Sequence, residues 1–377
     1  MALTDIDGQR LGDSVADKLG DRNLIINGAM QVAQRSTSPV AAVGYQSVDR
    51  WAISHSGTSG SVTQSQGSTG GPTGFSTYFR MTNSSTTTAT NGYRQIYQYI
   101  EAQNVRQFGW NYTDPNSEIT LSFKVRASVS QLYYGRLYTD DGAQQGFTFK
   151  ISKPDGTAID ADTWTDVTVV VPGNANITID NDNGVGLGVI FTPHYGTDLT
   201  DNSMTLNAWA AYNGAALSPD YATTWATTLN ATFDVTAVQL EVGNTATPFQ
   251  HRTYSDELQK CDRYCQVYRW PNLYENICFG GATAGGAQLD CILPLRNEMR
   301  TAPSTSDVVS AVAHFRVNDW RGHDEDANSL TFYSAGTSAV KIGATKPTAN
   351  MTAGYMGYLN VSTSAGGNAR WTFSAEL

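Results

Sequence analysis

The pattern of hydrophobic and polar residues predicts a chain built mainly from short β-strands. The clearest strand is Glu118–Ala127, in which apolar and polar residues alternate over the whole length. Such alternation is typical of an antiparallel strand with one buried face and one face in water. The residues expected to face the core are Ile119, Leu121, Phe123, Val125 and Ala127.

Between residues 23 and 245 about ten such patterns occur, separated by Gly, Pro, Asn and Ser, which predicts a β-sandwich or jelly roll. The last pattern changes phase midway, so we expect either a bulge or a strand covered on both faces. Gly186 and Gly188 likewise predict a bulge or a closely packed backbone. The expected strands are 23–32, 48–54, 61–66, 78–82, 93–100, 118–127, 131–138, 146–151, 164–171, 185–191, 204–212 and 233–242.

A helical pattern follows these strands. Thr253 and Asp256 are spaced as at a helix start, and residues at spacings of four, three, four and three then form one apolar stripe. That pattern predicts a short helix in a linker at residues 251–270. The stripe consists of Tyr254, Leu258, Cys261, Cys265 and Tyr268.

Strand patterns resume after the helix and predict a smaller β domain. We therefore expect four parts: an N-terminal attachment segment at 1–22, a jelly-roll sandwich at 23–250, the linker helix, and a β domain at 271–377. The expected strands of that last domain are 274–280, 287–293, 308–318, 329–334, 351–361 and 370–377.

The N-terminal segment carries Leu11, Val15 and Leu19 at four-residue steps, which predicts a helix over 13–19. A helix this short is unstable alone. Two interpretations stay open, a frayed terminus and a peptide that anchors the chain to a larger particle.

Composition and charge exclude several classes of partner. The net charge is −10, and no run of Lys or Arg offsets it, so neither nucleic acid nor an anionic membrane surface is an expected partner. No apolar segment approaches the ~20 residues that a membrane span needs, and membrane insertion is not expected. The N-terminus is polar and acidic, unlike a signal peptide.

Four cysteines, Cys261, Cys265, Cys278 and Cys291, are expected to be buried free thiols. A zinc site with His251 and a disulfide framework are the less favoured alternatives. No cofactor is expected. The run 180–184, Asp-Asn-Asp-Asn-Gly, could chelate a structural Ca²⁺, although an Asx-rich turn is the favoured interpretation.

The sequence shows no catalytic motif, and we predict no catalytic residue and no enzyme. Paired carboxylates can hydrolyse a polysaccharide, but neighbouring acids on loops are more often turn residues. The candidate sets are Asp140 with Asp141, Asp160 with Asp162, Asp180 with Asp182, and Asp324 with Glu325 and Asp326.

Aromatic residues give the best indication of binding, because sugars stack on exposed rings. Tyr93, Tyr97 and Tyr99 share one strand face. An irregular segment with polar residues between its rings is the first choice for a glycan surface. Its candidate residues are Trp209, Tyr212, Tyr221 and Trp225.

Five segments, in matching order, resemble phage-encoded tail-fibre and appendage proteins. They are Asn23–Arg35, Val48–Trp51, Thr236–Tyr264, Leu293–Ser304 and Phe373–Leu377. The resemblance implies a jelly roll like that of carbohydrate-binding modules, a homotrimer, a place on the virion and contact with host surface glycan. A capsid decoration or head-fibre protein that stabilises the shell is the first alternative, and a polysaccharide depolymerase is the second.

Overall fold

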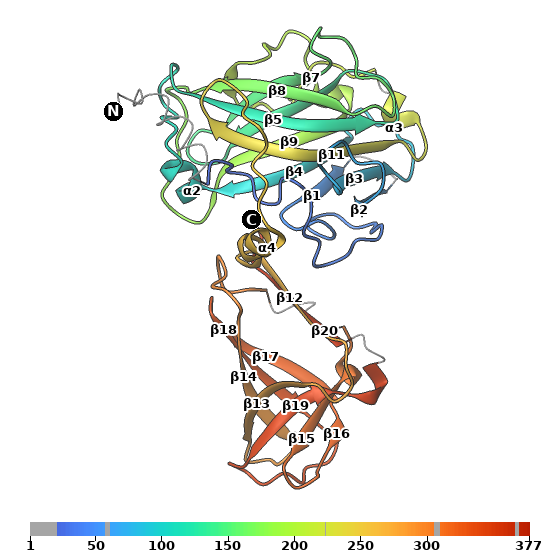
Figure 1. Cartoon of the computed structure of the whole chain (residues 1–377), viewed down its shortest axis with the longest axis vertical. Helices are drawn as coiled ribbons and strands as arrows, with labels where there is room; N and C mark the ends of the chain where they lie inside the picture. The colour runs from blue at the N-terminus through green and yellow to red at the C-terminus, as the bar shows by residue number, and fades with distance from the viewer. Residues whose placement is uncertain (1–20, 57–60, 223, 305–309, 366–368) are drawn as a thin grey trace, which may run out of the picture. The chain divides into compact units, whose positions relative to one another are not determined.

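The structure is a computed structural model that describes residues 21–56, 61–222, 224–304, 310–365 and 369–377. Its contacts divide the chain into two compact units, one that runs to Tyr254 and one at Ser255–Glu376 (Figure 1). The candidate attachment residues Leu11, Val15 and Leu19 lie outside the described residues.

The first unit is a sandwich of two antiparallel sheets (Figure 1). We call them the site sheet and the β11 sheet. In spatial order, the site sheet contains β1 (Ala52–Ser56), β4 (Tyr93–Glu101), β9 (Val185–Tyr195), β6 (Tyr133–Thr139), β7 (Gln145–Ile151) and β10 (Trp209–Ala211). The β11 sheet contains β2 (Val62–Gly67), β3 (Tyr78–Asn83), β11 (Thr232–Val242), β5 (Glu118–Ala127) and β8 (Thr165–Pro172). The described residues of this unit also form three short helical segments: α2 (Ala102–Gln107), η1 (Thr197–Leu199) and α3 (Thr224–Thr227).

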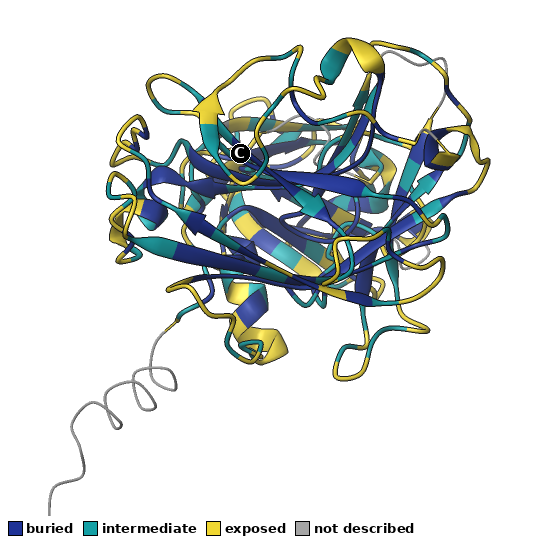
Figure 2. Ribbon diagram, turned by 90° about the horizontal axis from the view of Figure 1, so that it is seen from above, coloured by how far each residue is buried: buried dark blue, intermediate teal, exposed yellow. Residues whose placement is uncertain are grey.

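The core lies between the two sheets. The buried residues are concentrated on the strands and the exposed ones on the loops (Figure 2). The alternation predicted for Glu118–Ala127 is confirmed, because all five of its apolar positions are buried in this core. Trp51, just before β1, is fully buried, with its ring stacked 6.0 Å from that of Phe191.

Strand β11 is both bulged and covered on both faces, so the two alternatives inferred from its change of phase occur together. Its pairing with β5 shifts register between Thr236 and Gln239, and Ala237 at the shift has a positive φ of 55°. Apolar residues such as Val235 and Leu240 fill the core, while polar residues on the same strand are equally buried. The outer face of this strand is therefore a buried polar layer.

The strand predicted at 23–32 is wrong, because this segment is an irregular loop. Asn27 and Met30 both have φ of 57°, which a strand does not allow. The Asn27 side chain donates to the carbonyls of Val32 and Asp49 and accepts from the Val32 N–H, which replaces a β-ladder. Gly28 fits because a Cβ there would lie 2.1 Å from the Val238 carbonyl oxygen.

One buried carboxylate organises the outer face of the β11 sheet. Asp234 is fully buried and accepts hydrogen bonds from Arg80 at 2.8 Å and from Arg126 at 2.8 and 3.0 Å. The Tyr78 ring lies 5.3 Å from the Arg80 guanidinium and 5.0 Å from that of Arg126. Two arginines on strands either side of β11 thus satisfy the buried charge and tie three strands together.

Helix α4 (Tyr254–Asp262) leads into the second unit, which contains the two-stranded sheet of β12 (Cys265–Trp270) and β20 (Ala369–Ser374). A separate seven-stranded sheet contains, in order, β16 (Glu325–Asp326), β15 (Phe315–Asp319), β19 (Met356–Val361), β13 (Asn276–Ala282), β14 (Gln288–Pro294), β18 (Ala339–Thr345) and β17 (Ser329–Ala335). Among the described residues, the 3-10 helix η2 (Val312–His314) precedes β15, and η3 (Thr363–Ala365) lies between β19 and β20 of the two-stranded sheet. The all-β class predicted from sequence, a jelly-roll sandwich with a short helix and a smaller second β domain, is confirmed.

The linker helix is shorter than its apolar stripe predicts. It ends at Asp262, and Cys265 and Tyr268 belong to strand β12. Residues 265–270 pair one by one with residues 374–369, a partner that the local spacing cannot reveal. The four cysteines are buried free thiols, as predicted. In the described parts of the chain, no helix is long and apolar enough to cross a membrane.

The replacement of Asp234 by asparagine is expected to destabilise the first unit strongly. Asp234→Asn leaves Arg80 and Arg126 without their shared counter-charge, which costs about 3 kcal/mol of unfolding free energy for a buried pair. Chemical denaturation measures the loss. Asp166→Asn is the matched control, because the side chain of Asp166 is 77% exposed and its pair with Lys124 contributes little. Equal stability of the two variants would contradict the role given to Asp234.

Candidate functional site

Two of the four predicted glycan-contact residues lie in the interior. Trp225 is fully buried and donates its indole N–H to the Thr232 carbonyl at 3.0 Å. Tyr221 is 8% exposed, and its hydroxyl donates to the Thr192 carbonyl at 2.8 Å. Neither side chain offers a ring face to a ligand, so we do not retain these two residues in the candidate site.

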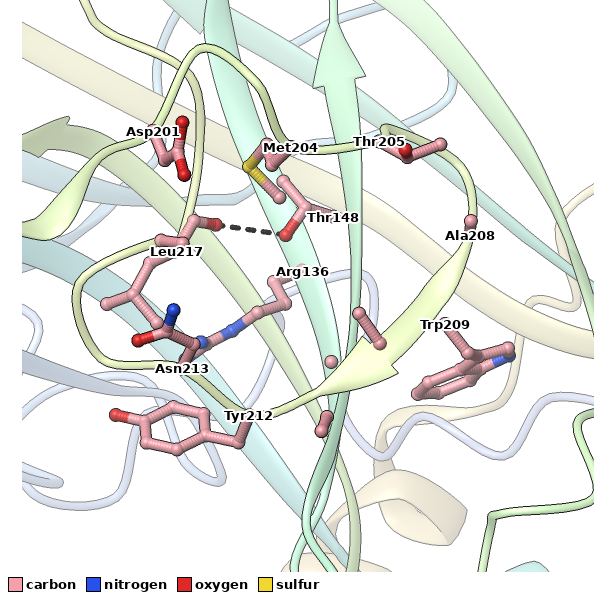
Figure 3. Close-up of a pocket in the computed structure, with 14 residues that line it drawn as sticks. Arg136, Thr148, Asp201, Met204, Thr205, Ala208, Trp209, Tyr212, Asn213 and Leu217 are labelled. Atoms are coloured by element: carbon pink, nitrogen blue, oxygen red, sulfur yellow. Dashed lines mark hydrogen bonds between the residues drawn. The ribbon is translucent and has the colours of Figure 1, made fainter.

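The other two, Trp209 and Tyr212, line one pocket at the edge of the site sheet (Figure 3). Strand β10 forms the edge of the site sheet by pairing with β7, and Trp209 lies opposite Phe147. Trp209 is half-buried, and its indole N–H donates to the Pro172 carbonyl at 2.7 Å. Tyr212 follows the strand and is 44% exposed. The segment predicted as a strand at 204–212 thus contributes only a three-residue strand and a pocket wall.

A second pocket adjoins the first and shares Arg136, Tyr212 and Leu217 with it. The volumes are about 410 Å³ and 260 Å³. We call the pair the Arg136 site. The second pocket is lined by aromatic and amide side chains of strands β4, β6 and β9 and of their connections, including Tyr93, Gln95, Tyr99, Tyr138 and Gln144.

Strand alternation brings these residues to the outer face of the site sheet. Leu137 points into the core, so Arg136 and Tyr138 on either side of it point outward. Tyr138 and Tyr99 both pair with Gly188 on the central strand β9. A Cβ on Gly188 would lie only 3.0 Å from the Tyr99 ring, so the glycine makes room for an aromatic side chain over the strand.

Arg136 is the central charged group of the site. Its guanidinium lies 5.5 Å from the Tyr138 ring centroid and 5.4 Å from that of Tyr212, which holds it by cation–π contacts. Figure 3 shows it reaching toward Tyr212 and Asn213. No carboxylate of the described residues pairs with it, and its Nε has no hydrogen-bond partner there. Arg136 is 8% exposed and its Nε is buried, so only an oxygen of a molecule bound in these two pockets can accept a hydrogen bond from its guanidinium.

Arg136 is not among the candidate binding residues predicted from the sequence, although the sequence contains a signal for it. It stands two residues from Tyr134 and Tyr138 in a strand, so it shares their face. Tyr134 itself is buried beneath Tyr221, with ring centroids 5.1 Å apart. The aromatic face therefore extends toward the tyrosines of β4, where the rings of Tyr97 and Tyr99 lie 4.8 Å apart.

Asp201 is the one carboxylate among the described residues that line the Arg136 site. Hydrogen bonds from the Ser203 hydroxyl and N–H hold the pKa of Asp201 below its usual value. Asp201 thus stays ionised and can accept hydrogen bonds but is poorly suited to donate a proton. The site combines ring faces, one guanidinium and one carboxylate, a set suited to a polyhydroxylated ligand.

The acidic sets proposed from sequence for hydrolysis have local roles. Asp140 accepts from the Tyr138 hydroxyl at 2.7 Å, and Asp160 pairs with Lys153 at 3.1 Å. Asp324 pairs with Arg316 at 3.0 Å, Glu325 accepts from Thr348, and Asp326 accepts from Ser362.

The calcium candidate is an exposed turn. Within it, the Asp182 carboxylate accepts from the Gly184 N–H at 2.8 Å, as in an Asx turn. Asp141 accepts from the Asp180 N–H at 2.9 Å. Burial raises the pKa of Asp141, and the carboxylates of Asp180, Asp182 and Asp140 add to that rise. In the part of the chain that the structure describes, no group of three or more His, Cys, Asp or Glu residues is placed to hold a metal ion.

No family model and no curated protein matches this sequence. Among solved structures, the chain is similar to the enzymatically active domain of tailspike protein 4 from bacteriophage CBA120, at 12% identity and a TM-score of 0.31 over 59% of this chain. It is also similar to a family 11 carbohydrate-binding module from Clostridium thermocellum in complex with a β-1,3-1,4-mixed-linked tetrasaccharide, at 10% identity and a TM-score of 0.28 over 56% of this chain. A family 30 module of a cellulosomal cellulase from Clostridium thermocellum matches at 12% identity and a TM-score of 0.26 over 57% of this chain. The alignments span 21% of the tailspike chain, 99% of the family 11 module and 98% of the family 30 module.

A buried histidine in the site sheet predicts a pH-dependent stability. His194 is 3% exposed and pairs across the strands with Arg94, which is fully buried. Burial, and then the charge of Arg94, lower the pKa of His194 from 6.5 to about 4. Between these values the unfolded chain binds more protons, so stability is complete above pH 6.5 and falls as the pH drops toward 4.

The loss over that window is expected to be about 3 kcal/mol of unfolding free energy, measured by urea denaturation across the pH range. His194→Phe removes the titrating group and is expected to flatten the profile there. His314→Gln in the second unit is the control and keeps the slope. An unchanged slope in His194→Phe would show that other groups cause it.

Proposed function

We propose that this chain is a non-enzymatic glycan-binding protein of a bacteriophage virion, most simply a tail fibre or tail-associated appendage. The observation that carries the glycan-binding part is the Arg136 site. There Arg136, which has no carboxylate partner among the described residues, is held between two tyrosine rings on the outer face of the site sheet. Ring faces can stack on the apolar faces of sugar rings, while Arg136 and Asp201 can exchange hydrogen bonds with sugar hydroxyls.

The chemistry of the lining supports binding without hydrolysis. Glycoside hydrolysis uses two carboxyl groups on either side of the scissile bond, one of them protonated. The described lining of the Arg136 site offers only Asp201, whose pKa is lowered. A second acid is missing from this set, so we assign the chain no catalytic step.

The place on the virion follows from the resemblance of five sequence segments to phage appendage proteins. In this proposal the segment with Leu11, Val15 and Leu19 anchors the chain to another virion protein, and the chain forms a homotrimer. Several weak sites on linked copies raise the apparent affinity for a repeated surface glycan. Such multivalent binding does not need a deep pocket in any one copy.

Replacement of Tyr212 tests the glycan site. Tyr212→Ala removes an exposed ring and one of the two contacts that hold Arg136, so we expect about tenfold weaker binding, as the loss of a stacking contact implies. The measurement is binding to a microarray of bacterial capsular and lipopolysaccharide glycans, followed by calorimetry with the best glycan.

Tyr355→Ala is the matched control, because Tyr355 is a 52% exposed tyrosine of the second unit with Arg321 4.5 Å from its ring. The control is expected to bind like the parent chain. Parent-like binding by Tyr212→Ala, or the absence of binding to every glycan, would overturn the assignment of the site.

Cryo-electron microscopy of the intact particle tests the place on the virion. We expect copies grouped at the tail, with the N-terminal segment in contact with another virion protein. Copies distributed over the capsid lattice would instead identify a decoration protein and refute the tail assignment, while leaving the glycan measurements valid.

A further inference from the structure

A second hollow lies on the opposite side of the sandwich, on the outer face of the β11 sheet. Its volume is about 390 Å³, which is enough for a monosaccharide and part of its neighbour. It is formed entirely by residues of the first unit. The floor comes from β5 and β8, one wall from the loop at 73–75, and the other wall from the segment at 246–251.

Three aromatic rings form a compact cluster at the walls. The rings of Phe75 and Phe249 meet edge to face at 5.0 Å, and the ring of His251 stacks on Phe75 at 5.1 Å. His251 also lies 5.0 Å from Phe249. All three side chains line the hollow and remain partly exposed or exposed. Aromatic side chains at an open hollow offer the surface on which a sugar ring can stack.

The wall at 246–251 is fixed by buried polar side chains of β11. Glu241 accepts from the N–H and the hydroxyl of Thr247, at 2.9 and 2.6 Å. Gln239 accepts from the Gln250 N–H at 2.8 Å. Both acceptors are almost fully buried. The segment that carries Phe249 is therefore held in place before any ligand arrives, which lowers the entropic cost of binding.

The opposite loop is fixed in a similar way. The carbonyl of Gly70 accepts from Arg126 Nη1 and from the indole N–H of Trp164, both at 2.9 Å. A Cβ on Gly71 would lie 2.4 Å from the Phe75 carbonyl oxygen, so only glycine allows this loop to close tightly. Loop and segment are thus both anchored to the outer face of the same sheet.

The floor of the hollow is polar and electrically balanced. Ser122 pairs with Thr168, and Lys124 pairs with Asp166, across the β5–β8 ladder. The Lys124 ammonium and the Asp166 carboxylate form an ion pair, with Asp166 77% exposed. The ammonium can donate a hydrogen bond to one hydroxyl of a bound sugar, and the carboxylate can accept one from the adjacent hydroxyl. Since their charges cancel, the floor gives no preference for a charged ligand.

We infer that this hollow is a second saccharide site that takes a neutral hexose unit of a glycan. The sugar ring lies against Phe249 and Phe75, and its hydroxyls reach Lys124 and Asp166. The site is on the sheet opposite the Arg136 site, so one copy of the chain can hold two glycan segments at once. The inference uses a different set of residues from the proposed function and is tested separately from it.

The experiment is a titration of the full-length, isotope-labelled chain with glucose, galactose and N-acetylglucosamine, followed by NMR of the backbone amides. Saturable shifts are expected at Ser122, Thr168 and Ala237. Asp166→Asn, which removes an acceptor at an exposed position, and Phe249→Ala, which removes a ring, are each expected to weaken this binding about tenfold. Tyr138→Ala in the Arg136 site is expected to leave these shifts unchanged.

Two outcomes would overturn the inference. One is the absence of saturable shifts at Ser122, Thr168 and Ala237 with all three sugars. The other is retention of binding within about twofold in both Asp166→Asn and Phe249→Ala, a difference too small for a lost contact. Shifts near Tyr99 and Tyr138 report on the proposed function independently, so failure of either site is recognised without the other.

Discussion

The burial of β11 on both faces is the constraint on which the first unit depends. One face belongs to the apolar core, while the other carries Asp234, Gln239 and Glu241, which are also buried. A buried polar group without a partner is costly, so each of these side chains has to find one. Arg80 and Arg126 satisfy the carboxylate of Asp234, and the segment at 247–250 satisfies Gln239 and Glu241. Partners that lie far apart in the sequence are thereby brought to one strand.

Strand alternation explains the parts of the fold that the sequence could predict. The pattern of 118–127 predicts its own burial, because its five apolar side chains all lie in the core. The loop at 23–32 could not be predicted in this way. Ile25, Met30 and Val32 are buried, but the backbone is paired by the Asn27 side chain and by β11, more than 200 residues away. The same holds for β12, whose strand partner lies at the other end of the second unit.

The candidate site, too, could be predicted only in part from the sequence. The segment at 209–225 is rich in aromatic residues, and two of the four, Trp209 and Tyr212, do line a pocket. Tyr221 and Trp225 have the same composition around them but are covered by the sandwich. Composition shows that aromatic residues are present, but it does not show on which face of a sheet their side chains lie. The Arg136 site can be recognised only once the pairing of β6 with β9 is known, and the hollow near Phe249 only once the bulge in β11 is known.

The ribbon of β12 and β20 has a mechanical consequence. Its first pair joins Cys265, where the second unit has just begun, to Ser374, near the end of that unit. A load applied between these two positions pulls on the same end of both strands. The backbone hydrogen bonds then break one after another, as in a zipper, and do not share the force as they would in shear. Under such a load the second unit would accordingly lengthen first at this ribbon, by gradual peeling of β12 from β20.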